Sequence, residues 1–329
     1  MRRRLPTFTP ARVELLALLA LAALTIIVLT GAAVRLTGSG LGCPNWPKCG
    51  ESVVAPLETH AWIEYGNRLA SAFVGLVAFA AGFAAWRRRP YRRDLSIIGV
   101  LLPLGVLAQG ILGGLTVLFH LKPGFVMGHF LLSMVILCAA VALYWRARHE
   151  PEQLARPVND RRLVRATRLL LPVGALALVA GTVATAAGPH AGENEENDPV
   201  GRLDLFGTLD TVIHWHGRTG TLLGLSALAV WFLARRWGGS ADLRRALTVL
   251  CLLVAAQGVV GFAQYELELP AEIVWFHILI ATAAWVALLL AVAAAGRLGP
   301  AHVPAAHTTP VEPDAVASPV LGSAEPHMR

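Results

Sequence analysis

The sequence predicts an all-α membrane protein with eight transmembrane helices, arranged as two pseudo-symmetric four-helix bundles. Two observations carry this prediction: eight apolar stretches long enough to cross a bilayer, and an internal repeat that pairs the first four with the last four. Of the 329 residues, 55% are apolar and 15% are charged, and the mean hydropathy is +0.58. Because soluble domains are about 25% charged, this composition indicates a membrane protein.

Each predicted span has the length needed to cross the hydrocarbon core, about 20 residues. The spans are 12–34, 62–86, 95–118, 125–145, 168–187, 212–234, 243–263 and 272–296. They divide the chain into an N-terminus (1–11), an N-terminal bundle (12–145), a linker (146–167), a C-terminal bundle (168–296) and a tail (297–329). The first span lacks a small-residue cleavage site, so it is interpreted as a retained helix and not as a signal peptide.

The positive charges predict the orientation of these spans. All but six of the 28 Lys and Arg residues lie at the N-terminus, in the loops 87–93, 146–168 and 235–245, or after the last span. The positive-inside rule therefore predicts a cell-membrane protein with a cytoplasmic linker and both termini in the cytoplasm. The net charge of +7 is then a signal of topology and of contact with anionic lipid, not of nucleic-acid binding. The tail, rich in Pro, Ala, His and Ser, is predicted to be disordered.

The repeat pairs all four spans of the first half with those of the second half, at an offset of 148–150 residues. The matched stretches are LAQGILGG (107–114) with AAQGVVGF (255–262), VMGHFLL (126–132) with VWFHILI (274–280), and TGAAVRLTGSG (30–40) with AGTVATAAGPH (180–190). His129 thus corresponds to His277, and Asn67 corresponds to His216. An even number of helices per copy makes both copies cross in the same direction, with the repeat axis along the membrane normal.

Polar residues inside the spans gather near the predicted outer face. They are Glu64, Asn67, His129, His214, His216 and His277. Ionisable residues within a membrane are functional hypotheses by default. His216 and His277 come from two helices of one bundle, and paired histidines of this kind hold a haem iron through both axial positions. His214, two residues from His216, points elsewhere and is interpreted as an interfacial residue.

The first bundle offers a different set of side chains. His129 is its one strong iron ligand, because Asn67 stands where the other bundle has His216. Glu64 shares a helix face with Asn67. Arg68 is expected to turn elsewhere, towards the interface or an anion, although a simple salt bridge between Glu64 and Arg68 is the alternative.

Cys43 and Cys49 lie in the first outer loop, GCPNWPKCG (42–50). An oxidising outer side favours a disulfide, either a structural bond or a redox-active one. A metal site is less favoured, because two cysteines without clustered histidines leave the ligand shell incomplete. The acidic stretch GENEEND (192–198) is interpreted as a solvated loop.

Taken together, RLTGSGLGCPNWPKCG, IEYGNRL, GHFLLS, TAAGPHAG and WFHILIA resemble the haem A synthase family, and the similarity spans residues 12–296. The resemblance implies oxidation of the C8 methyl of haem O to a formyl group by successive hydroxylation, for cytochrome oxidase assembly. It also implies that His216 and His277 bind haem b, that His129 binds the iron of haem O, and that Glu64 is catalytic. Cys43 and Cys49 match the cysteine pair of the family's first outer loop.

Two departures from the family pattern matter. Many members have His where this chain has Asn67, so the second axial ligand of the substrate haem differs, and His60, one turn before Glu64, is an accessory candidate beside Arg68 and His214. Some members also carry a second cysteine pair in the third outer loop, which this chain lacks. Asn67 is expected to orient Glu64 or a water molecule.

Two other functions stay open on the sequence alone. A two-haem electron carrier linked to quinol would need four comparable ligands, and Asn67 breaks that set. A transporter would place its polar site at mid-membrane, whereas these residues lie towards one face. The expected partners are haem O, delivered by haem O synthase, an electron acceptor and the lipid bilayer, and homo-oligomerisation stays open.

Overall fold

The computed structural model describes residues 6–189, 203 and 205–298. Within this part of the chain the regular structure is helical, and eight helices are long and apolar enough to cross a membrane. They are α1 (Pro10–Leu36), α2 (Thr59–Trp86), α3 (Arg93–Leu118), α4 (Pro123–Arg148), α6 (Arg161–Ala187), α7 (Leu209–Arg236), α8 (Ala241–Glu266) and α9 (Ala271–Ala295). The all-α, multi-pass prediction is confirmed for these residues. The acidic loop 192–198 and the tail from 299 onwards lie outside them.

Seven of the eight helices are longer than the predicted apolar stretches, because the helix continues beyond the stretch at one or both ends, whereas α9 has the same length as its stretch. α4 and α6 both extend into the predicted linker 146–167, which also contains a one-turn helix, α5 (Pro151–Ala155), that the hydropathy pattern does not reveal. α6 begins early because Asp160 caps it, accepting a hydrogen bond from the Arg162 N–H (2.7 Å).

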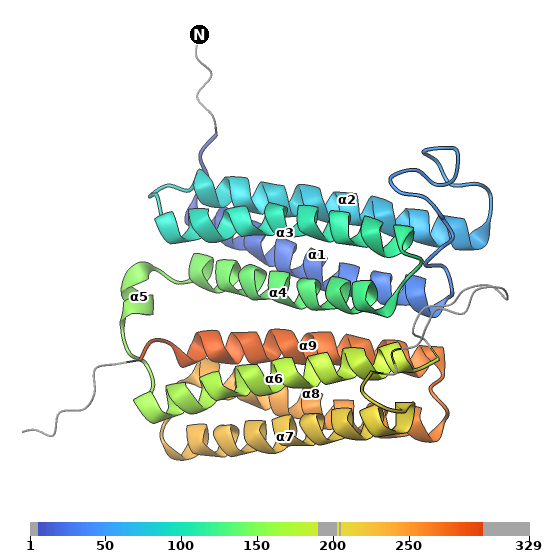
Figure 1. Ribbon diagram of the computed structural model, residues 1–329. Coiled ribbons are helices and arrows are strands. Elements are labelled where there is room, and N and C mark those ends of the chain that lie inside the picture. The colour runs from blue at the N-terminus through green and yellow to red at the C-terminus, as the bar shows by residue number, and fades with distance from the viewer. Residues whose placement is uncertain (1–5, 190–202, 204, 299–329) are drawn as a thin grey trace, which may run out of the picture. The chain divides into compact units, whose positions relative to one another are not determined.

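Two sets of helices pack internally in the same way. α1, α2, α3 and α4 each contact the next helix along the chain, and α1 also contacts α4. The contacts among α6, α7, α8 and α9 repeat this pattern, and the two sets meet through α1, α4, α6 and α9 (Figure 1). We term α1–α4 the N-terminal helix group and α6–α9 the C-terminal helix group.

Two tryptophans of α9 join the groups through hydrogen bonds. Trp275 Nε1 donates to the Leu29 carbonyl of α1 (3.0 Å), and Trp285 Nε1 donates to the Met134 carbonyl of α4 (3.0 Å). An indole N–H removed from water needs an acceptor, and both tryptophans find one on the N-terminal helix group. These bonds therefore set the position of α9 against the N-terminal helix group.

Successive helices run in opposite directions, so the starts of α2, α4, α7 and α9 lie at one end of the helices (Figure 1). The loop 37–58, which contains Cys43 and Cys49, lies at the same end. We term it the disulfide end. Glu64, Asn67, His129, His214, His216 and His277 all fall within about the first three turns of these helices. The polar residues singled out from the sequence are therefore gathered near this end.

Candidate haem sites and the disulfide loop

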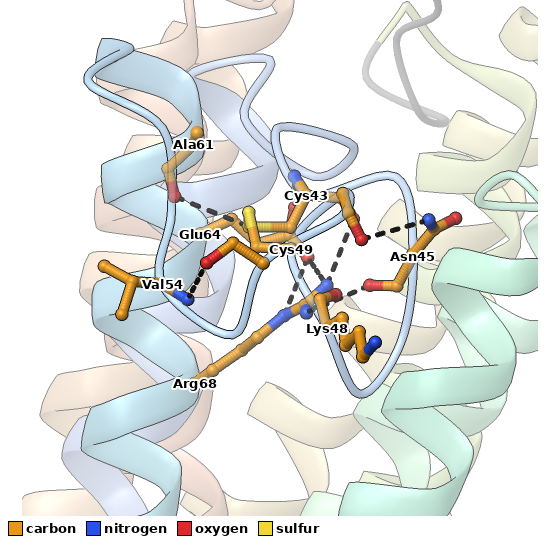
Figure 2. The surroundings of a disulfide bond; sticks show 10 residues. Cys43, Asn45, Lys48, Cys49, Val54, Ala61, Glu64 and Arg68 are labelled. Carbon is orange, nitrogen blue, oxygen red and sulfur yellow. Dashed lines mark hydrogen bonds and ion pairs between the residues drawn. A yellow bond between two sulfur atoms is a disulfide. The ribbon is translucent and has the colours of Figure 1, made fainter.

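The loop 37–58 is attached to α2 by Glu64 and Arg68 (Figure 2). Cys43 and Cys49 form a disulfide, which confirms that prediction. One carboxylate oxygen of Glu64 accepts a hydrogen bond from the backbone N–H of Cys43 (2.6 Å), and the other pairs with Arg68 Nη2 (2.5 Å). Arg68 also donates to three loop carbonyls, those of Cys43, Asn45 and Lys48, at 3.0–3.1 Å.

The expectation that Arg68 turns away from Glu64 is therefore wrong. Arg68 lies one turn after Glu64 on the same helix face, and the loop carbonyls satisfy the rest of its guanidinium. Only 7% of the Glu64 side chain is exposed, so this ion pair is screened far less than one on a surface. Each carboxylate oxygen can accept two hydrogen bonds, so Glu64 keeps acceptor capacity beyond these contacts.

The loop also covers the end of α3. Trp46 lies so close to Gly114 that a Cβ there would be 2.5 Å from the indole Cδ2. A Cβ on Gly42 would lie 2.3 Å from the backbone oxygen of His60, at the start of α2, so no side chain would fit on Gly42. These glycines bring the loop into contact with the helix ends.

His129 lies near the start of α4, with its ring against Gly113 of α3. A Cβ on Gly113 would lie 3.0 Å from His129 Cε1. The amide of Gln109, also on α3, donates to the backbone carbonyl of His129 (2.8 Å) and to the hydroxyl of Ser133. The ring atom Nδ1 of His129 is buried and makes no hydrogen bond within the described part of the chain. Because a buried structural histidine normally has a hydrogen-bond partner, this unpaired nitrogen makes His129 a candidate ligand.

His216 and His277 face each other in the C-terminal helix group. Their ring centroids are 6.0 Å apart, with an angle of 75° between the ring planes. His216 lies against Gly181 of α6 and His277 against Gly261 of α8, so each ring rests on a neighbouring helix at a glycine, as His129 does. Both Nδ1 atoms are buried without a hydrogen bond of ordinary geometry among the described residues, although the Ala177 carbonyl lies towards His216.

This separation fits two axial ligands of one haem iron. With metal–nitrogen bonds of about 2 Å and ring nitrogens about 1.2 Å from the centroid, imidazoles on opposite faces of one iron have centroids about 6.4 Å apart. The observed 6.0 Å is close to that value. The angle between the planes is no obstacle, because each ring can turn about its metal–nitrogen bond. The pair therefore fits a haem group.

Comparison with known proteins identifies the family of the chain. The sequence profile of the COX15-CtaA family, described as cytochrome oxidase assembly proteins, matches residues 14–201, more than half of the chain. The chain belongs to the COX15-CtaA family. The match includes Glu64, Asn67 and His129, whereas His216 and His277 lie beyond it.

Relatives of this COX15-CtaA protein include several named heme A synthase. That of Geobacillus thermodenitrificans is 37% identical over 142 residues, which are 41% of this chain and 44% of the relative. That of Geobacillus kaustophilus is 35% identical over 40% of this chain and 42% of the relative. The alignment with these two thus spans less than half of their length. That of Shewanella oneidensis is 25% identical over 77% of this chain and 87% of the relative.

In this member of the COX15-CtaA family, Asn67 is held by α1. The Thr30 hydroxyl donates to Asn67 Oδ1 (2.8 Å), and among the described residues no hydrogen bond joins Asn67 to Glu64. The repeat pairs Gly31 with Gly181, yet a Cβ on Gly31 would have nothing within 4 Å, whereas Gly181 contacts His216. Asn67 therefore leaves open the space that His216 fills in the other helix group.

The two accessory histidines lie apart from these rings. His60 is exposed and its Nδ1 lies 2.9 Å from the hydroxyl of Ser39 in the loop. His214 is 57% exposed, with Nδ1 2.8 Å from the Asp210 carbonyl. The interfacial interpretation of His214 agrees with this exposure.

Sequence reasoning missed several residues of this COX15-CtaA site. They are Thr30, Trp46 and the glycines Gly113, Gly181 and Gly261. The glycines could have been found, because Gly113 and Gly261 fall at matching positions in the repeat. Thr30 and Trp46 carry no such signal, because their partners lie far away in the sequence.

Proposed function

We propose that this protein is a haem A synthase, which oxidises the C8 methyl of haem O to a formyl group for cytochrome c oxidase assembly. The observation that carries the proposal is the contrast between the two helix groups. One presents a facing histidine pair, and the other presents His129, Asn67 and a buried carboxylate. Family membership and the relatives named heme A synthase support the same assignment.

In this proposal His216 and His277 are the axial ligands of a resident haem b. A haem b held by these two residues would supply one-electron transfer. His216 and His277 are half-buried, and the Nδ1 atom of each ring is buried. Gly181 and Gly261 set the position of each ring by contact.

The N-terminal helix group would hold the substrate haem O, with its iron on His129. Thr30 holds the short side chain of Asn67, and the space beside Gly31 is open. Each hydroxylation would remove two electrons, which pass to the electron acceptor, and two protons, and would add the oxygen of a water molecule to the methyl carbon. Glu64 would accept a proton or stabilise positive charge that develops at that carbon, and Arg68 and the Cys43 amide would keep its carboxylate in place.

The finer architecture belongs to the same proposal. The N-terminal bundle (12–145) and the C-terminal bundle (168–296) would be pseudo-symmetric copies around an axis along the membrane normal, joined by a cytoplasmic linker. The repeated contact pattern supports this arrangement. The basic residues of the linker and of 87–93 and 235–245 lie opposite the disulfide end, which supports cytoplasmic termini and haem sites near the outer face.

Haem extraction after co-expression with a haem O synthase tests this function. Haem A in the extract supports it, whereas unchanged haem B alone would support an electron carrier, and a haem-free protein a transporter. The partners follow from the reaction: haem O arrives from a haem O synthase, and an electron acceptor takes the electrons.

Glu64→Gln is the sharpest variant for this reaction. Removing the negative charge should lower haem A formation about 100-fold or more, since general acid–base groups contribute about 10²–10⁴ in rate. Glu58→Gln is the matched control, because Glu58 precedes α2 and is exposed without a side-chain capping bond. A normal rate in purified Glu64→Gln protein would remove Glu64 from the mechanism.

A further inference from the structure

Arg35 is a half-buried cation without a partner at the disulfide end of α1. Its Nε and Nη2 atoms are buried, and they form no hydrogen bond with any described residue. None of the ion pairs of the described residues involves it. Because an unpaired buried charge is strongly unfavourable, such a group is expected to bind an anion.

The position of Arg35 tells where this anion would bind. The buried residues of α1 follow a helical spacing, and they are Val13, Ala17, Ala20, Leu21, Leu24, Val28 and Val34. Gly31 and Arg35 continue that spacing, so they lie on the same inward face, one turn apart. On this face Gly31 has nothing within 4 Å of its Cβ position. Arg35 therefore lies about 6 Å further along the helix axis, beside the open space next to Asn67.

The C-terminal helix group lacks this feature. The residue that the repeat pairs with Arg35 is Thr185, and its hydroxyl donates to the Gly181 carbonyl of its own helix (2.8 Å). The space beside Gly181 is filled by His216. The open space and the unpaired guanidinium thus occur together, and only in the group that presents Asn67.

We propose that Arg35 binds a propionate carboxylate of the substrate haem in the N-terminal helix group. This inference rests on the proposed function, because it takes the occupant of that space to be a haem. The planar guanidinium matches a carboxylate through two parallel hydrogen bonds, which an ammonium cannot form. Arg35 is a positioning residue: by holding one edge of the porphyrin, it sets which ring methyl faces Glu64.

The experiment compares haem O with its dimethyl ester, which has the same ring and no carboxylates. Each is titrated into the purified full-length protein, and binding is followed by the absorbance change that His129→Ala abolishes. Wild type should bind the acid about tenfold or more tightly than the ester. Arg35→Gln should bind both with the affinity of the ester, and Arg35→Lys should fall between them. Arg12→Gln, at the exposed opposite end of α1, should behave as wild type.

Two results would overturn the proposal. The first is that the wild-type protein binds acid and ester with equal affinity. The second is that Arg35→Gln protein keeps the wild-type ratio of the two affinities. In that second case, an equal loss of affinity for acid and ester would point to a lipid phosphate or to the fold as the partner of Arg35. Haem A formation by wild type is assayed separately, so failure of the synthase proposal is distinguished from failure at Arg35.

Discussion

At the scale of single residues, the two helix groups differ most at Asn67 and His216. Both follow the start of a helix by about two turns, and the sequence repeat alone pairs them. The sequence could predict this pair, the disulfide and the Glu64–Arg68 alternative. It could not predict the direction of Arg68, because its acceptors are backbone carbonyls of a folded loop about 20 residues away.

Asn67→His should give the N-terminal helix group a facing histidine pair like that of the C-terminal helix group. The open space at Gly31 accommodates an imidazole as Gly181 does, so the new ring can face His129. Purified protein should then hold an additional, firmly bound low-spin haem, seen by absorbance and electron paramagnetic resonance. Asn67→Gln, which keeps an amide, is the control. A spectrum unchanged from wild type would contradict the inference that Asn67 stands at the position of His216 in the repeat.

At the scale of helices, the hydropathy pattern predicted the number and order of the spans but not their ends. An apolar stretch shows only the part of a helix that lies in hydrocarbon. α6 begins earlier, at Arg161, because Asp160 caps its first turn. The contacts between helices near the histidines depend on glycines. His216 and His277 approach α6 and α8 only because Gly181 and Gly261 lack side chains.

Gly261→Ala should therefore disturb the haem b site. The new Cβ would lie 3.2 Å from His277 Cε1, which is tighter than an ordinary contact, so the ring must shift. We expect weaker haem b retention and a partly high-spin spectrum. Gly258→Ala is the matched control on the same helix, where a Cβ meets nothing within 4 Å. The control should be neutral or slightly stabilising, by about 0.5–1 kcal/mol. Identical spectra for the two variants would argue against His277 as a ligand.

At the scale of the whole molecule, α9 joins the two helix groups. Its tryptophans donate to carbonyls of α1 and α4, which belong to the other group. The repeat predicted two similar units but not the interface between them. Trp275 and Trp285 donate to backbone carbonyls, and every residue has a backbone carbonyl, so the sequence does not identify the acceptors. The sequence therefore does not predict which helices of one group contact which helices of the other.

Trp285→Phe should destabilise the protein as a whole. It removes the N–H that pairs with the Met134 carbonyl, and such a bond contributes about 0.5–1.5 kcal/mol. We expect a lower midpoint of thermal unfolding in detergent, with both haem sites lost together. Trp237→Phe, at the more exposed end of α7, is the control. Separate loss of the two sites would show that the groups unfold independently.

The contact between Glu64 and the Cys43 amide has a consequence in terms of thermodynamic linkage. A bond between a carboxylate and the backbone of a disulfide loop couples the two in both directions with one coupling free energy. If the intact disulfide holds Glu64 in its charged, hydrogen-bonded state, then Glu64 favours the oxidised cysteines by the same amount. The redox equilibrium of the disulfide and the protonation equilibrium of the buried carboxylate are thus thermodynamically coupled.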